Sequence, residues 1–461
     1  MKRAGAARAP FFLKKKGEVR RRQPPGGAGA AAPHGLLRAA VPALGSRLLD
    51  LPSRYGFHLL VAAGLGMVGA GDFYIVFSLM VALAGLGRLG IDRALTREVA
   101  IALAAGRPGQ ARRLIHHAVL LVGLLSGGLA LALALAAEPL ARLALHRPDL
   151  AGPLALGALA ILPQNLSTVA AGALAGLRRI GLSQMVYSWL WPALFCGAAP
   201  LLGLAVPNAL GLIAACFTVA ALIGGLCLFR LLPRGDTGAA EPPPPLLRPG
   251  LSLFSLELAQ LTLATAPALI LGLVADSAAV GGFALAWRIA LLANIVISGV
   301  AALASPRFAA LHDRGDRAGL RRTAALAGGL GFALALPALA LMLALPGPLL
   351  GLFGAGFEQA AGVLRLLALG QIVAASCTAL PELLGMTGQE ASLRRINAAV
   401  IVATLGGVAL LAPRWGAEGA ALATALALAA AGAGAAAVAW RRLDVAPWRD
   451  LPGEIRCWKK G

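Results

Sequence analysis

The chain has 461 residues, of which 59% are hydrophobic and only 13% are charged, and its mean hydropathy is +0.79. Soluble domains carry about 25% charged residues, so the composition excludes a soluble protein and predicts an all-α integral membrane protein. The net charge of +21 would suggest nucleic acid for a soluble chain. Here the basic residues stand at the ends of apolar runs, which is typical of membrane topology, and no nucleic-acid partner is expected.

Residues 1–50 are predicted to form a basic N-terminal arm followed by an interfacial helix. The first 22 residues hold nine lysines or arginines and lack the apolar core and small-residue cleavage site of a signal peptide. We expect this arm to lie near anionic lipid head groups. Residues 36–51 combine leucines with Arg38, Arg47 and Asp50, which favours a helix at the membrane surface.

Twelve apolar runs follow, each near the roughly 20 residues that cross a hydrocarbon core of about 30 Å. Six fall in an N-terminal bundle at 51–231 and six in a C-terminal bundle at 250–440. Between them lies a linker at 232–249, whose prolines at 242–245 cannot continue a helix, and a basic tail follows at 441–461. The runs are 53–71, 73–91, 114–137, 150–172, 184–204, 208–230, 250–275, 281–304, 322–345, 361–383, 396–412 and 416–440.

The distribution of basic residues predicts that both termini, the linker and the tail are cytoplasmic. With twelve spans, Arg142, Arg147 and Arg414 fall outside, and Arg288 and Arg365 fall within spans. This leaves 36 of the 41 lysines and arginines on or near the inner face. Such a bias follows the positive-inside rule and predicts a multi-pass protein of a cytoplasmic (inner) membrane.

The two halves repeat each other at an offset of about 210 residues. At an offset of 209, Arg112 falls on Arg321, and at 210, Gly71 falls on Gly281. An even number of spans in each half means that the halves share one orientation and are related by an axis along the membrane normal. Secondary transporters built in this way carry their substrate between the halves.

Motifs for covalent chemistry are missing from the sequence. There is no GxxxxGK[ST], HExxH or GxSxG pattern, and no pair of carboxylates in a recognisable frame. The five cysteines show no CxxC spacing. We therefore do not expect an enzyme, and we predict neither a metal ion nor another cofactor.

Polar side chains inside the spans are the candidate site residues, because each costs several kcal/mol unless it is paired or faces water. Arg288 and Arg365 are interpreted as binding the anionic head group of a substrate, with snorkelling as the alternative for Arg365. Glu257 is interpreted as part of an inner gate; a structural partner and a proton site remain alternatives. The polar cavity or gate set is Glu257, Gln260, Gln371, Gln164 and Asn165.

Three further residues near the span boundaries are given structural interpretations. Asp72 follows Gly71 at the predicted outer boundary and is interpreted as a turn residue. Trp189 and Trp191 lie near an interface and are interpreted as part of an aromatic belt.

Seven segments, in order over about residues 45–440, resemble bacterial polysaccharide (O-antigen-type) flippases of the multidrug/oligosaccharidyl-lipid/polysaccharide exporter superfamily. The resemblance implies a MATE-like, V-shaped pair of six-helix bundles. It also implies alternating access that moves a polyprenyl-pyrophosphate-linked oligosaccharide to the outer leaflet, with Arg288 contacting its anionic head. The segments are 71–79 (GDFYIVFSL), 87–100 (GRLGIDRALTREVA), 280–290 (VGGFALAWRIA), 305–316 (SPRFAALHDRGD), 350–357 (LGLFGAGF), 383–389 (LLGMTGQ) and 416–424 (GAEGAALAT).

One segment departs from the family pattern. Relatives often carry an acidic residue before the Leu-Gly step of the seventh span, whereas residues 264–272 read ATAPALILG. Ion coupling is therefore not carried over, and the driving force stays open between an ion gradient and consumption of the product. The expected partners are the lipid-linked oligosaccharide, membrane lipids, and glycosyltransferases or a polymerase of the same pathway.

Three alternatives remain beside the flippase. A cation-coupled multidrug or metabolite exporter of the same superfamily predicts an acidic cavity, which the buried arginines do not favour. A membrane-bound polysaccharide-assembly enzyme predicts large outer loops with catalytic residues, and the outer loops here are short. A scaffold predicts that Arg288→Ala has no effect.

Overall fold

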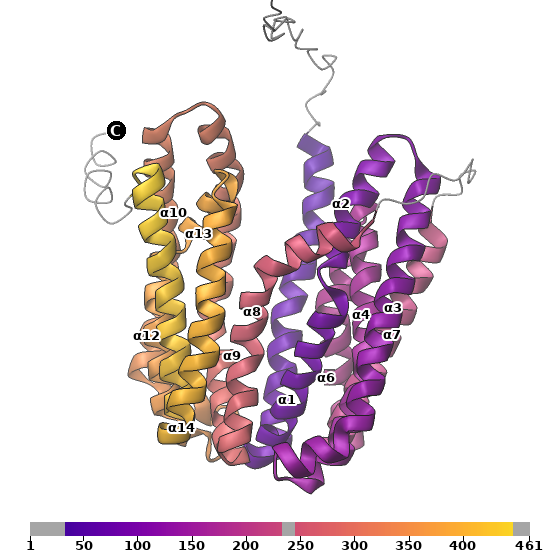
Figure 1. The fold of residues 1–461 in the computed structure, drawn as a ribbon, viewed down its shortest axis with the longest axis vertical. Helices are drawn as coiled ribbons and strands as arrows, with labels where there is room; N and C mark the ends of the chain where they lie inside the picture. Colours follow the sequence, from indigo (N-terminus) through magenta and orange to yellow (C-terminus); the bar gives the residue numbers. More distant parts are fainter. Residues whose placement is uncertain (1–32, 233–244, 446–461) are drawn as a thin grey trace, which may run out of the picture.

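The computed structural model describes residues 33–232 and 245–445, and these residues form two helical bundles without a β-strand (Figure 1). The basic arm, most of the linker and most of the tail lie outside the described residues and stay predictions. The first bundle contains α1 (Pro33–Arg88), α2 (Ile91–Ala104), α3 (Pro108–Pro139), η1 (Leu140–Ala144), η2 (Pro148–Leu150), α4 (Ala151–Gly176), α5 (Ile180–Gln184), η3 (Met185–Trp189), α6 (Leu190–Leu202) and α7 (Val206–Leu231). The second contains α8 (Leu247–Val274), α9 (Ser277–Asp313), α10 (Arg317–Ala344), α11 (Pro346–Gly351), η4 (Phe357–Ala360), α12 (Ala361–Ser376), α13 (Ala379–Met386) and α14 (Glu390–Leu443).

Local sequence explains where α9 and α10 begin. The carboxylate of Asp276 accepts a hydrogen bond from the backbone N–H of Ala279 at 2.8 Å, and Asp316 accepts one from Gly319 at 2.8 Å. Each aspartate is an N-cap that satisfies an amide left without a partner by the first helical turn.

Ten helical stretches in the described part of the chain are long and apolar enough to cross a membrane, so the chain is a multi-pass membrane protein. Two of them, Leu49–Ala104 and Glu390–Leu443, have 56 and 54 residues. At 1.5 Å per residue each would span about 80 Å, more than twice the hydrocarbon core. Each contains a glycine outside the helical region, Gly66 (φ 66°) or Gly416 (φ 53°). If each crosses twice, the total is the predicted twelve, and that number stays a prediction.

The first predicted boundary is wrong in position. The chain leaves helical geometry at Gly66, while Asp72 continues the helix and is not a turn residue. Glycine tolerates the positive φ at position 66 without a steric penalty. The predicted interfacial helix at 36–51 is not separate either, because α1 continues through it into the first span. The Arg54 guanidinium lies 3.1 Å from the Asp50 carboxylate across this junction, a spacing typical of one continuous helix.

The bundles form a V (Figure 1). They diverge toward the end that carries the start of α1 and the end of α14, here called the open end, and they meet at the opposite, closed end. There α1 and α9 approach so closely that a Cβ on Gly71 would lie 1.7 Å from the carbonyl oxygen of Ser277. A Cβ on Gly281 would lie 2.2 Å from the carbonyl oxygen of Met67, so only glycine fits at either place.

This contact has the symmetry of the sequence repeat. Met67 and Ser277 are 210 positions apart, as are Gly71 and Gly281. Gly71 therefore meets the repeat equivalent of Met67, and Gly281 meets Met67 itself. Such a reciprocal pattern is expected where a two-fold axis passes through a contact. The repeat recognised in the sequence is thus the symmetry of the closed end.

Arg147, in the connection between η1 and η2, ties the two bundles together at the closed end. Its guanidinium donates to the carbonyl oxygen of Ala275 at 2.6 Å and to the Ser277 hydroxyl oxygen at 2.9 Å. It also lies 3.4 Å from the Asp72 carboxylate, which accepts a hydrogen bond from the Ser277 hydroxyl. The side chains of Arg147 and Asp72 are each 17% exposed, so solvent screens this ion pair less than a surface pair.

Candidate functional site

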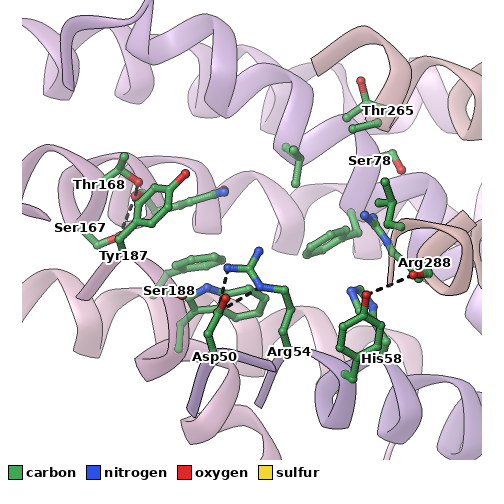
Figure 2. Close-up of a pocket in the computed structure, with 18 of the residues that line it drawn as sticks. Asp50, Arg54, His58, Ser78, Ser167, Thr168, Tyr187, Ser188, Thr265 and Arg288 are labelled. Atoms are coloured by element: carbon green, nitrogen blue, oxygen red, sulfur yellow. Dashed lines mark hydrogen bonds and ion pairs between the residues drawn. The ribbon is translucent and has the colours of Figure 1, made fainter. Parts of the chain in front are cut away.

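A cavity of about 660 Å³ lies between α1, α4, α5, η3, α6 and α7 of the first bundle and α8 and α9 of the second. This volume falls within the range of small-molecule sites. Its lining includes Arg54, Arg88, Arg288 and Asp50, so three cations face one carboxylate and the formal charge is +2. Most other polar lining residues are neutral, and Figure 2 shows several of them.

Arg288 reaches the cavity from α9, eleven residues after Ser277 at the closed end, or about 16 Å along the helix. Its guanidinium carbon lies 5.9 Å from the ring centroids of both Tyr74 and Phe77 on α1. Within 33–232 and 245–445 no carboxylate lies within ion-pair distance of it, and its buried Nε has no hydrogen-bond partner. Two aromatic faces hold the cation in place and leave its charge uncompensated.

Arg54 and His58 lie on successive turns of α1 and also line the cavity. The guanidinium of Arg54 donates to the Asp50 carboxylate at 3.1–3.2 Å, so this charge is already paired. The imidazole of His58 lies 3.0 Å from the Tyr74 hydroxyl, with Nδ1 facing the oxygen. Figure 2 places Arg54 between Asp50 on one side and His58 and Arg288 on the other.

Arg88 lines the cavity at the end of α1 and is held by two partners. It donates to the Asn165 amide oxygen at 3.3 Å and lies 3.9 Å from the Glu257 carboxylate. Asn165 is fully buried and donates to the carbonyl oxygen of Ala84 at 3.0 Å and to the Ser126 hydroxyl oxygen at 2.7 Å. Asn165 therefore orients Arg88 and joins α1, α3 and α4; it does not itself line the cavity.

Glu257 connects the two bundles nearer the open end. Its carboxylate oxygens lie 3.9 Å from Arg88 on α1 and 3.4 Å from Arg93 on α2. Because Glu257 belongs to α8, these ion pairs hold the first half of α8 against the first bundle, the side on which Figure 1 draws it.

The structure brings only part of the predicted site together. Arg288 and Gln164 line the cavity. Arg365 is exposed on α12, where its Nε donates to the carbonyl oxygen of Leu343 at 3.4 Å, so it does not join Arg288. Gln371 is buried at 2% exposure away from the cavity lining, and Gln260 is exposed on α8.

Sequence reasoning missed Arg54, His58 and Trp191. The first two follow Asp50 at intervals of four residues, a spacing that puts polar groups on one helix face and was available from sequence. Trp191 is only 8% exposed and stacks on Phe217 at 4.8 Å between ring centroids, so it is not a belt residue. No signal in the sequence distinguished a tryptophan of the interfacial belt from one packed inside the bundle, since both lie in an apolar run.

The profile of the family described as "polysaccharide biosynthesis protein" matches residues 49–312, more than half of the chain. An inward-facing multidrug resistance MATE family transporter of the MOP superfamily is similar in fold, with a TM-score of 0.69 and 18% identity over 86% of this chain and 94% of its own. The lipid II flippase MurJ, in an inward closed conformation, has a TM-score of 0.68 and 12% identity over 90% and 89%. A MOP superfamily transporter from Pyrococcus furiosus, for which reverse polarity of the binding pocket suggests a different function, has a TM-score of 0.59 and 18% identity over 89% and 95%. No curated protein matches the chain significantly.

Proposed function

The chain belongs to the polysaccharide biosynthesis protein family, and from this premise we propose that it flips a polyprenyl-pyrophosphate-linked oligosaccharide across the bacterial cytoplasmic membrane. The observation that carries the proposal is the uncompensated cation of Arg288 inside a cavity between two membrane bundles. The task requires no covalent chemistry, so the protein acts as a transporter and not as an enzyme.

A pyrophosphate is the ligand chemistry that suits this cation. A charge within the bilayer is expensive unless it is paired or hydrated. Among the residues that the structure describes, Arg288 has two aromatic rings but no carboxylate beside it. A guanidinium donates parallel hydrogen bonds to phosphate oxygens and stays charged at all physiological pH values. A bound pyrophosphate would supply the negative charge that Arg288 lacks.

The same geometry supports alternating access. With both termini in the cytoplasm, the open end faces the cytoplasm, where lipid-linked substrates are assembled. Release on the other side then requires the closed end to separate, which breaks the Gly71 and Gly281 contacts and the hydrogen bonds of Arg147. The Glu257 ion pairs contribute to the inner gate, because they connect α8 to the first bundle near the open end.

An exporter of organic cations is disfavoured by the charge of the cavity. Such a substrate requires acidic or aromatic walls free of competing cations. Here the lining carries three arginines and one aspartate, and that aspartate is engaged by Arg54. The net positive field of the cavity would repel a cationic drug.

The proposal is tested in liposomes that contain the purified protein and a fluorescent polyprenyl-pyrophosphate oligosaccharide, with flipping read as loss of protection from a membrane-impermeant quencher. Arg288→Ala removes a charged hydrogen-bond donor that contributes about 1.5–3 kcal/mol. We expect flipping at limiting substrate to fall about 10- to 150-fold. Arg288→Lys keeps the charge but cannot donate two parallel hydrogen bonds, so its flipping rate should lie between those of wild type and Arg288→Ala.

Arg365→Ala is the matched control, since it removes an arginine of the second bundle that lies outside the cavity. It should flip the probe at the wild-type rate. The Arg288→Ala protein must insert into the membrane and have the same free energy of unfolding as wild type. If such a protein flips the probe at the wild-type rate, the assignment of Arg288 to the pyrophosphate is refuted.

A further inference from the structure

One side of the cavity is a continuous neutral surface that the pyrophosphate site does not use. Figure 2 shows Ser167, Thr168, Tyr187 and Ser188 on one side of the cavity, away from His58 and Arg288 on the other. The surface, here called the neutral wall, comes from α4 and from α5 with η3. Its members are Gln164, Ser167, Thr168, Gln184, Tyr187 and Ser188.

The α4 part of the neutral wall offers hydrogen-bond acceptors. The hydroxyls of Ser167 and Thr168 donate to the carbonyl oxygen of Gln164 at 2.7 and 2.9 Å. Their single hydrogens are therefore used within the helix, and their oxygens are left as acceptors. In the described part of the chain no donor reaches the buried amide oxygen of Gln164. A ligand that satisfies these atoms must bring O–H or N–H groups.

The other part of the neutral wall carries an aromatic ring on a distorted helix. Residues Met185–Trp189 form a π-helical turn between α5 and α6, and π turns are frequent at functional sites. Tyr187 in this turn is 52% exposed and lines the cavity. Its ring offers a flat apolar face with a hydroxyl at its edge, which suits a ligand that is apolar on one face and hydroxylated at its rim.

Negative charge at the neutral wall is already supplied by the protein. Asp50 is the one carboxylate among the described residues that line the cavity, and Figure 2 places it between the wall and Arg288. Among the described residues, the cation that bonds Asp50 is Arg54, at 3.1 Å. An acidic ligand group at the α4 part of the wall would face the acceptor oxygens of Ser167 and Thr168 and the Asp50 carboxylate, all of which disfavour a further negative charge.

We propose that the neutral wall binds the sugar attached to the pyrophosphate and selects an uncharged sugar rich in hydroxyl or acetamido donors over an acidic one. This inference rests on the proposed function, because it assigns the sugar half of the ligand whose pyrophosphate Arg288 binds. It assigns specificity to α4 and η3, while affinity for the anionic head stays with α9.

Two probes and two wall variants test the inference in the liposome assay. The probes are polyprenyl pyrophosphate carrying N-acetylglucosamine and the same lipid carrying glucuronic acid. Wild-type protein should flip the neutral probe about tenfold or more faster. Gln164→Met and Thr168→Val each remove one acceptor at nearly constant shape and should slow the neutral probe about 3- to 10-fold, leaving the acidic probe unchanged.

Gln110→Met is the matched control. The amide oxygen of Gln110 on α3 is also buried, has no hydrogen-bond partner among the described residues, and lies outside the cavity. It should leave the ratio of the two rates unchanged. Flipping of both probes with a ratio that the two wall variants do not alter would overturn the neutral wall alone. If wild-type protein flips neither probe, the proposed function is refuted, and so is this inference, which depends on it.

Discussion

The glycine contact at the closed end makes Gly71→Ala the most demanding test of how the bundles move. The new Cβ would lie 1.7 Å from the carbonyl oxygen of Ser277, whereas real Cβ atoms essentially never approach closer than 3.0 Å. The backbones of α1 and α9 must therefore separate by at least about 1.3 Å, the difference between these distances. Overpacking of this kind costs about 1–3 kcal/mol, so the ratio of closed to separated molecules at this end should fall about 5- to 150-fold.

Pulsed electron paramagnetic resonance measures this separation between spin labels at Arg142→Cys and Arg414→Cys, in a background without native cysteines. Both positions are exposed, one on each bundle. Gly71→Ala should shift the distance distribution to longer values, and Gly281→Ala, with a 2.2 Å approach, should shift it less. Gly211→Ala is the control, since nothing lies within 4 Å of its new Cβ. A Gly71→Ala distribution identical to wild type would refute the idea that this contact closes the end.

Three further variants test single interactions. Arg147→Ala removes the hydrogen bonds to Ala275 and Ser277. It should destabilise the closed state by about 1.5–3 kcal/mol and shift the label distances to longer values; an unchanged distribution would contradict a role for Arg147 in closure. Asn165→Ala leaves its buried partners unsatisfied and should lower the free energy of unfolding by about 1–3 kcal/mol, seen as a lower Tm in detergent; a wild-type Tm would show that water replaces the amide. Glu257→Ala should insert normally but flip slowly and fail to support surface polysaccharide, because both ion pairs to the first bundle are lost; normal glycan display would remove Glu257 from the gate.

The fold class followed from sequence because the bilayer permits few solutions. A segment inside hydrocarbon must satisfy its own backbone, so long apolar runs become helices, and ten such stretches are present in the described residues. The repeat was readable because Gly71 and Gly281 must both be glycine for the backbones to meet. Boundaries were less certain: Gly66 and Gly71 are both possible breaks by composition, and only the structure shows that the break lies at Gly66, while Gly71 stays helical and contacts Ser277.

The candidate site was only partly predictable, for a related reason. A charge deep in a span is costly wherever it lies, so sequence alone identified Arg288. Depth does not specify the face of a helix, and Arg365 and Gln371 share that depth argument without reaching the cavity. Asn165 was predicted to face the cavity but is held by hydrogen bonds to α1 and α3, while Arg54, which was not among the predicted site residues, lines the cavity.

Sequence by itself thus determined the membrane class and the duplicated scaffold and predicted two intramembrane arginines, Arg288 and Arg365, since each follows from the free energy of placing a residue type in lipid. Tertiary structure decided which polar groups neutralise one another. Asp50 pairs with Arg54 and Glu257 with Arg88, and Arg288 is left with aromatic rings. The Asp50–Arg54 pair follows an i,i+4 spacing within one helix. The partners of Glu257 and the rings beside Arg288 depend on distances of a few ångströms between helices far apart in the chain, and no pattern within one helix specifies them.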